Sequence, residues 1–175
     1  MNRFTPRLTR PEIGNRYYNT PDAGGYAVGV INGNPLDPGC NVLSNCVGYA
    51  AGRFNEILGQ NKFVYFRYPR NPVDWISDAI AQGLEVGFKP ELGCVMVWNR
   101  HVAVVEKIES ENKIVTSESG YGCQNPFWIS EIVNTNGKWG STEPYLGCIY
   151  LPDNFGDGIE IKVVANGKTY KGVCV

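Results

Sequence analysis

The sequence predicts an α+β domain in which N-terminal helices pack on a C-terminal antiparallel β-sheet. Apolar residues recur with helical spacing between residues 47 and 83, whereas β-branched and aromatic runs separated by turns follow Pro90. Helices followed by strands, rather than alternating with them, are typical of an α+β fold. The chain has 175 residues, which is enough for one domain with a sizeable core.

The composition excludes several classes of protein. Sixteen basic against seventeen acidic residues give a net charge of −1, so no strong field attracts nucleic acid or an anionic membrane surface. The apolar runs fall short of the roughly 18 residues that a membrane span needs. We therefore expect neither nucleic acid nor a membrane as partner. The protein is also expected to be a monomer.

Residues 1–40 form a turn-rich arm without a sustained period. Turn signals occur at residues 20–22, 24–25, 32–34 and 37–39. The first 18 residues hold four arginines and one glutamate, and we expect this charge to face water rather than an acidic polymer. They contain no apolar core, so the sequence predicts no secretion signal.

Two helices are predicted next. The first begins beside Cys46, is about 13 residues long and places residues 47, 50, 51, 54, 57 and 58 on one face. Ser44 or Asn45 can cap its start and Gly59 its end. The second helix has Asn71 and Pro72 at its start and Gly83 at its end.

Strands are predicted at residues 94–98, 101–108, 113–117, 128–133 and 148–151, with a hairpin loop at 109–112. An Asn166-Gly167 turn between residues 159–165 and 168–175 predicts a further hairpin. The expected organisation is an arm (1–40) that belongs to the domain, the domain itself (41–155) and the hairpin (156–175). The hairpin either docks on the domain, which its apolar Ile159, Ile161 and Val163 favour, or opens a further domain.

One cysteine and one histidine are candidates for chemistry. Cys46 lies at a helix start, where unpaired N–H groups and the helix dipole favour a thiolate. The other five cysteines are expected to be free thiols, mostly buried, since the closest two cysteines are six positions apart and form no C-x-x-C clamp. His101 is the single histidine, and the hairpin after it could bring Glu118 near its ring. Each residue alone could equally be structural.

Taken together, five blocks of sequence resemble the CHAP domain, the cysteine, histidine-dependent amidohydrolase/peptidase module of phage endolysins and bacterial wall hydrolases. They extend in order from about Asn41 to Leu151: SNCVGYA with GRF, LGCVMVW, HVAVVE, SESGYG and GCIY. The resemblance implies a papain-like fold and cleavage of an amide bond in peptidoglycan. It also implies that Cys46 is the nucleophile, His101 the base and Glu118 the orienting carboxylate.

The resemblance further implies that Asn45 contributes to an oxyanion hole. Trp98, Tyr121 and Trp128 are expected to line the substrate groove. No cofactor is expected, and no calcium, because Gly39 and Gly48 stand where some family members have acidic residues.

The implied protein is an endolysin-type hydrolase, either an N-acetylmuramoyl-L-alanine amidase or a stem or cross-bridge endopeptidase. It would be made in the cytoplasm and act on the wall after release or delivery by other factors, and the C-terminal hairpin could open a missing wall-binding domain. The alternative is a non-catalytic wall-binding or virion structural module on the same fold.

Overall fold

The computed structural model describes residues 4–12, 15–19, 46–59, 71–120, 127–140, 142–152, 160–165 and 168–173. The predicted turns between residues 20 and 39 and the two candidate caps, Ser44 and Asn45, lie outside these ranges.

Helix α3 (Cys46–Leu58) confirms the first helix prediction and carries the candidate nucleophile at its first residue. Its apolar residues, among them Val47, Ala50 and Phe54, are buried against the sheet. Gly59 follows the helix with φ of 62°, a left-handed conformation that glycine adopts without strain. A short helix, α1 (Arg16–Asn19), packs on α3; the sequence analysis did not predict it.

The contact between α1 and α3 depends on Gly52. A Cβ at this position would lie 2.6 Å from the carbonyl oxygen of Tyr17 and 2.7 Å from the ring of Tyr18. The absence of a side chain therefore lets the two helices approach closely enough for Tyr18 to be buried against α3.

The second predicted helix begins as the 3₁₀ turn η2 (Pro72–Asp74) and continues as α4 (Trp75–Ala81). Trp75 and Ala79 are buried where α4 packs on the sheet, and Gly83 follows with φ of 78°. Among the described residues, no helix is both long enough and apolar enough to cross a membrane.

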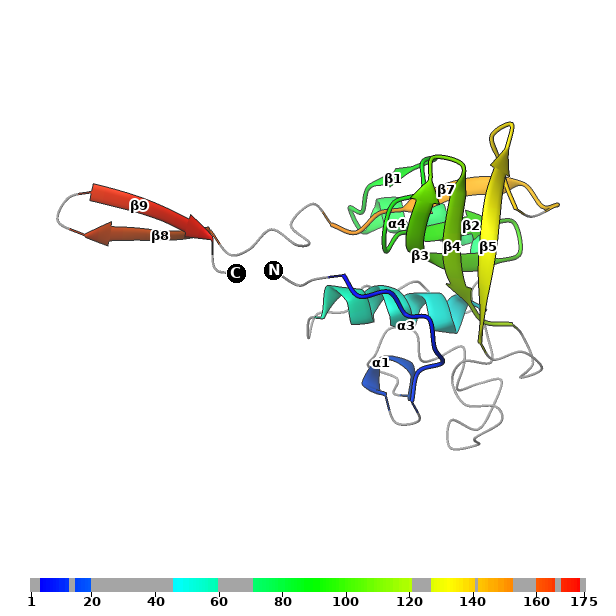
Figure 1. Cartoon of the computed structure of the whole chain (residues 1–175), viewed down its shortest axis with the longest axis horizontal. Coiled ribbons are helices and arrows are strands. Elements are labelled where there is room, and N and C mark those ends of the chain that lie inside the picture. The colour runs from blue at the N-terminus through cyan, green and yellow to red at the C-terminus, as the bar shows by residue number, and fades with distance from the viewer. Residues whose placement is uncertain are drawn as a thin grey trace.

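Seven strands form one antiparallel sheet (Figure 1). In chain order they are β1 (Val86–Gly87), β2 (Val95–Trp98), β3 (Val102–Ser110), β4 (Lys113–Glu118), β5 (Trp128–Thr135), β6 (Lys138–Trp139) and β7 (Tyr145–Ile149). Their order across the sheet is β1-β7-β2-β3-β4-β5-β6, so β2 to β6 form a meander and β7 returns to pair with β2. The predicted α+β arrangement is confirmed.

Three details of the strand prediction are wrong. The loop between β3 and β4 is shorter than predicted, because Ser110 and Lys113 already pair. The last strand runs from Tyr145 to Ile149 rather than over residues 148–151. The sequence analysis also missed β1 and β6, two-residue strands that exist through pairing with β7 and β5.

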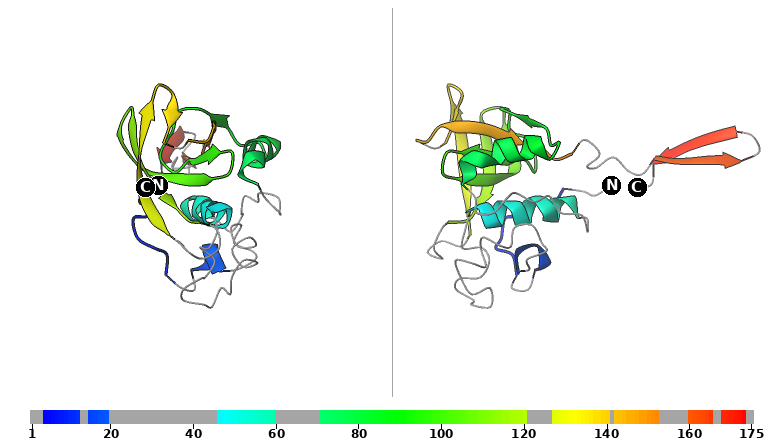
Figure 2. Two further views of the ribbon diagram at one scale, coloured as in Figure 1. Left: turned by 90° about the vertical axis from the view of Figure 1, so that its right-hand side faces the viewer. Right: turned by 180° about the vertical axis from the view of Figure 1, so that it is seen from behind.

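The central strands are buried on both faces. Val95, Val97, Val102 and Val104 belong to the core that includes residues of α3 and α4, whereas Met96, Trp98, Ala103 and Val105 belong to a second core. Alternate residues of a strand point to opposite faces of the sheet, so a continuous apolar run is typical of a strand that is buried on both faces. The curved sheet supplies the second cover itself, since Ile114, Ile132, Trp139 and Cys148 come from other strands of the same sheet (Figure 2).

The C-terminal strands β8 (Glu160–Ala165) and β9 (Lys168–Val173) form a separate two-stranded sheet. Ala165 pairs with Lys168, which leaves two residues between the strands and confirms the predicted hairpin. Figures 1 and 2 draw it away from the seven-stranded sheet. Whether it docks on the domain or opens another stays a prediction.

Candidate active site

The site lies where the first turn of α3 meets the sheet. Cys46 begins the helix, and its partly exposed side chain forms a hydrogen bond with His101. His101 lies between β2 and β3, in a turn closed by the hydrogen bond from the Trp98 N–H to the His101 carbonyl oxygen, 2.8 Å long. Helix packing and one tight turn thus bring the candidate nucleophile and base together.

Glu118 completes the group from the neighbouring strand. Because β3 and β4 are antiparallel, the start of β3 lies beside the end of β4. The carboxylate oxygen Oε2 of Glu118 lies 2.7 Å from Nε2 of His101. The predicted proximity of these two residues is confirmed. Because Nε2 is occupied by Glu118, Nδ1 is the ring nitrogen that remains for the Cys46 thiol.

The carboxylate of Glu118 is held in place by its own strand and the next. The Thr116 hydroxyl donates to Oε1 of Glu118 at 2.7 Å, and Ser130 forms a further hydrogen bond with the carboxylate. Burial of Glu118 raises its pKa, but the hydrogen bond and charge of His101 and these two hydroxyl groups outweigh burial and lower the pKa below its ordinary value. Glu118 is therefore an anion at neutral pH.

The same partners set the charge of His101. Burial of the ring lowers its pKa, but the hydrogen bonds and charges of Cys46 and Glu118 outweigh burial and raise the pKa to about 9. The imidazole is therefore protonated at neutral pH. An imidazolium next to a thiol favours the thiolate, which is the nucleophilic form of cysteine.

Two tryptophans surround the imidazole. The ring of Trp128 stacks on His101 with 6.0 Å between ring centroids and an interplanar angle of 13°. Its indole N–H donates to the Ser130 hydroxyl at 3.1 Å, so the residue that supports Glu118 also holds Trp128. Trp98 lies 6.2 Å from His101 but is only 2% exposed, and its N–H donates to the carbonyl oxygen of Trp139.

A cavity of about 450 Å³ opens on the Glu118 side of the imidazole. Its lining combines aromatic rings with carboxylates: Trp98, His101, Glu118, Gly120, Trp128, Ser130, Glu131, Ile132, Gly140 and Glu143. Glu143 in this lining is held by Arg100, whose backbone N–H and guanidinium both donate to it, at 2.8 and 2.7 Å. A mixed apolar and polar pocket of this size suits a short segment of peptide or sugar.

Two residues of the site were not predicted from the sequence, and two predicted site residues lie outside the part of the chain that the structure describes. Thr116 shares a strand face with Glu118, and Ser130 shares one with Trp128, so the two-residue period of a strand is the signal that could have found them. Asn45 and Tyr121 lie outside the described residues. Within the described part of the chain, no group of three or more His, Cys, Asp or Glu side chains is placed to hold a metal ion.

Comparisons with known proteins match part of the chain. Residues 37–120 match the CHAP domain family. Over 63 residues, 34% of this chain and 29% of the relative, the chain is 38% identical to a Streptococcus mutans serotype c protein that carries the name hydrolase. A crystal structure of N-acetylmuramoyl-L-alanine amidase from Staphylococcus aureus is similar with a TM-score of 0.43 and 20% identity, over 58% of this chain and 30% of that one.

The matched region spans less than a third of either relative. The family match ends at Gly120, two residues after the candidate carboxylate, and covers Cys46, His101 and Glu118. The resemblance that the sequence motifs indicated is therefore confirmed for residues 37–120, which are similar throughout to the CHAP domain.

Proposed function

We propose that this chain is a peptidoglycan hydrolase of the endolysin type that cleaves an amide bond with Cys46, His101 and Glu118. The observation that carries the proposal is the continuous contact from the Cys46 thiol through the His101 ring to the Glu118 carboxylate. The CHAP match supports the substrate class, and the name of the Streptococcus mutans relative supports hydrolysis.

The proposed reaction begins with attack of the Cys46 thiolate on the carbonyl carbon of the scissile amide. We assign stabilisation of the developing oxyanion to the backbone N–H of Cys46, at the start of α3, and to the Asn45 amide. The His101 imidazolium then donates its proton to the nitrogen of the leaving amine, and the C–N bond breaks to leave a thioester on Cys46.

The second half of the reaction uses the same residues, and the proton now moves toward His101. Neutral His101 accepts a proton from water as the water attacks the thioester carbonyl, and the Cys46 thiolate leaves. Glu118 stabilises the imidazolium in both halves and fixes the orientation of the ring, as an orienting carboxylate does in hydrolases of this kind.

The substrate bond is either the amide between N-acetylmuramic acid and L-alanine or a peptide bond of the stem or cross-bridge. The cavity beside His101 supports both choices, since its tryptophan rings and carboxylates can bind sugar or peptide. We propose that the protein acts as a monomer on the wall after release or delivery from the cytoplasm.

Digestion of purified peptidoglycan of several chemotypes, followed by mass spectrometry of the fragments, tests the proposal. An amidase releases whole stem peptides, whereas an endopeptidase releases fragments with a new N-terminus inside the stem or bridge. Cys46→Ala is the control. Binding to the wall without any new fragment would favour the alternative, a non-catalytic wall-binding module.

A further inference from the structure

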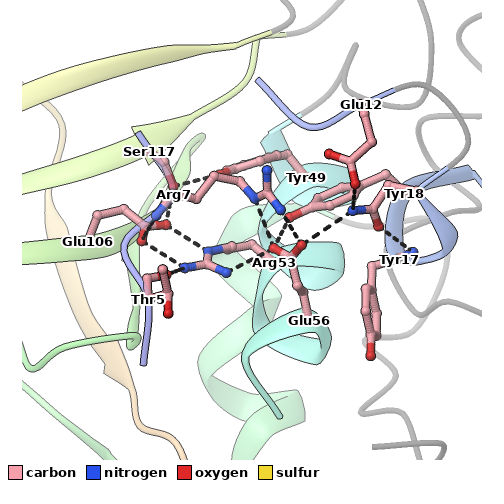
Figure 3. A network of polar contacts seen from close by, with 11 residues as sticks. Thr5, Arg7, Glu12, Tyr17, Tyr18, Tyr49, Arg53, Glu56, Glu106 and Ser117 are labelled. Carbon is pink, nitrogen blue, oxygen red and sulfur yellow. Dashed lines mark hydrogen bonds and ion pairs between the residues drawn. The ribbon is translucent and has the colours of Figure 1, made fainter. Parts of the chain in front are cut away.

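A buried polar network joins the N-terminal segment, α3 and the sheet (Figure 3). Its centre is Glu106 on β3, a carboxylate with 0% exposure. Arg53 of α3 donates to both carboxylate oxygens from Nε and Nη2, at 2.8 and 2.9 Å. The backbone N–H of Arg7 adds a further hydrogen bond at 2.7 Å. The N-terminal segment, the nucleophile helix and the sheet thus meet at one buried charge.

The network continues toward the site through two hydroxyl groups. Ser117 donates to Oε1 of Glu106 at 2.7 Å, and the hydroxyl of Tyr49 donates to the Ser117 oxygen at 2.6 Å. Tyr49 and Ser117 are both 0% exposed. Each stands next to a candidate catalytic residue, since Tyr49 is three residues after Cys46 on α3 and Ser117 directly precedes Glu118 on β4.

This placement matters because the two halves of the site come from different elements. Residues three apart on a helix share a face, so the hydroxyl of Tyr49 fixes the turn of α3 that carries Cys46. A buried carboxylate with charged and neutral donors is costly to disturb, which makes Glu106 a rigid anchor for both hydroxyl groups. The Tyr49 ring also contacts Phe127, the residue before Trp128, at 5.7 Å between centroids.

We propose that the Tyr49 hydroxyl, bonded through Ser117 to Glu106, is a positioning group that sets the distance between the Cys46 thiol and the His101–Glu118 pair. It touches neither the thiol nor the substrate. The proposal rests on the proposed function for its catalytic consequence, whereas its effect on the thiol can be measured without any substrate.

The chain offers a matched control. Tyr18 is as buried as Tyr49, stacks on it at 5.7 Å between centroids, and also donates its hydroxyl to this network, to Oε2 of Glu56 at 2.9 Å. Glu56 lies about two turns beyond Tyr49 on the helix, further from Cys46. Tyr49→Phe and Tyr18→Phe therefore each delete one buried hydroxyl, and only the first deletion loosens the link beside the site.

The test is the rate at which iodoacetamide alkylates Cys46, followed by peptide mass spectrometry from pH 5 to pH 10. We expect Tyr49→Phe to slow alkylation at pH 6 by about tenfold, since a displacement of about 1 Å can cost a hundredfold in a reaction that depends on alignment. At pH 10, a cysteine with the ordinary pKa of about 8.5 is ionised without help from a neighbouring group. At this pH, the alkylation rate of Tyr49→Phe should be within about twofold of the parent rate. Tyr18→Phe should follow the parent at both pH values.

Ser117→Ala removes the other hydroxyl of the link and should show the same pH-dependent loss. If both groups act through one link, the double variant Tyr49→Phe/Ser117→Ala should be no slower than the slower single variant. Equal rates at pH 6 for the parent, Tyr49→Phe and Ser117→Ala would overturn the proposal. Equal losses in Tyr49→Phe and Tyr18→Phe would also overturn it, because they would indicate general loosening. Failure of the parent to cut peptidoglycan would instead count against the proposed function alone.

Discussion

Nε2 of His101 lies 2.7 Å from Oε2 of Glu118, and this contact joins the start of β3 to the end of β4. It leaves the other ring nitrogen for Cys46. Burial lowers the pKa of the imidazole, but Cys46 and Glu118 together outweigh burial and keep the ring charged at neutral pH. A carboxylate in this position stabilises the imidazolium but forms no bond with substrate.

The first prediction concerns that carboxylate. Glu118→Gln keeps the shape of the side chain but removes its charge, so the pKa of His101 should fall from about 9 toward its ordinary value. The rate should fall by about 100-fold, less than the loss caused by Cys46→Ala. Titration of the His101 ring by NMR and the hydrolysis rate check both effects. An unchanged ring pKa would show that Glu118 does not help Cys46 to raise it.

The second prediction is a dependence of stability on pH. The pKa of His101 is raised from 6.5 to about 9 on folding, so its contribution to stability is fully present below pH 6.5 and is lost as pH rises through 9. The shift corresponds to roughly 3 kcal/mol. Urea unfolding at pH 6 and pH 9.5, compared with His101→Ala, measures the contribution. The variant should lose less stability than the parent between the two pH values; equal losses would contradict the assignment.

The third prediction separates the two tryptophans beside His101. Trp98 is buried and hydrogen-bonded to Trp139, so Trp98→Ala should lower the free energy of unfolding by about 3–5 kcal/mol. Trp128 stacks on the imidazole and lines the cavity, so Trp128→Ala should mainly lower kcat/KM, by about tenfold. The free energy of unfolding and kcat/KM, measured on both variants, check this prediction. It would be refuted if the two variants lost the same amount of stability and the same amount of kcat/KM.

The fourth prediction concerns calcium. Gly39 and Gly48 occupy positions where some CHAP domains carry acidic ligands, and a glycine offers no side-chain oxygen. Hydrolysis should therefore keep its rate in EDTA. Loss of activity in EDTA that calcium alone restores would overturn this expectation.

The sequence predicted long, regular elements well and missed those that depend on pairing. Helix α3 has a clear period and end signals, so its 13 residues were predicted almost to the residue. Strands of two residues, such as Lys138–Trp139, carry no readable pattern and form because a neighbouring strand offers hydrogen bonds. The last strand was placed too late because Gly147, with φ of 136°, interrupts its apolar pattern.

In the candidate site, too, local relationships could be predicted from the sequence and contacts between distant segments could not. His101 and Glu118 could be paired from the sequence because a single hairpin connects them. Thr116 and Ser130 were not predicted, although the two-residue period of a strand could have indicated them. The Glu106 network could not be predicted, since it arises from contacts between two strands, a helix and the N-terminal segment. Nothing in the sequence indicated the pairing of Arg100 with Glu143, 43 residues away.

The most direct test of the central claim is wall hydrolysis by Cys46→Ala and His101→Ala beside the parent protein, with circular dichroism to verify that each variant is folded. Nucleophile and base act as a unit, so each substitution should reduce the rate by about 10⁴-fold or more, and the double variant should be no worse than either single one. Turnover within about tenfold of the parent rate in either folded variant would contradict the account.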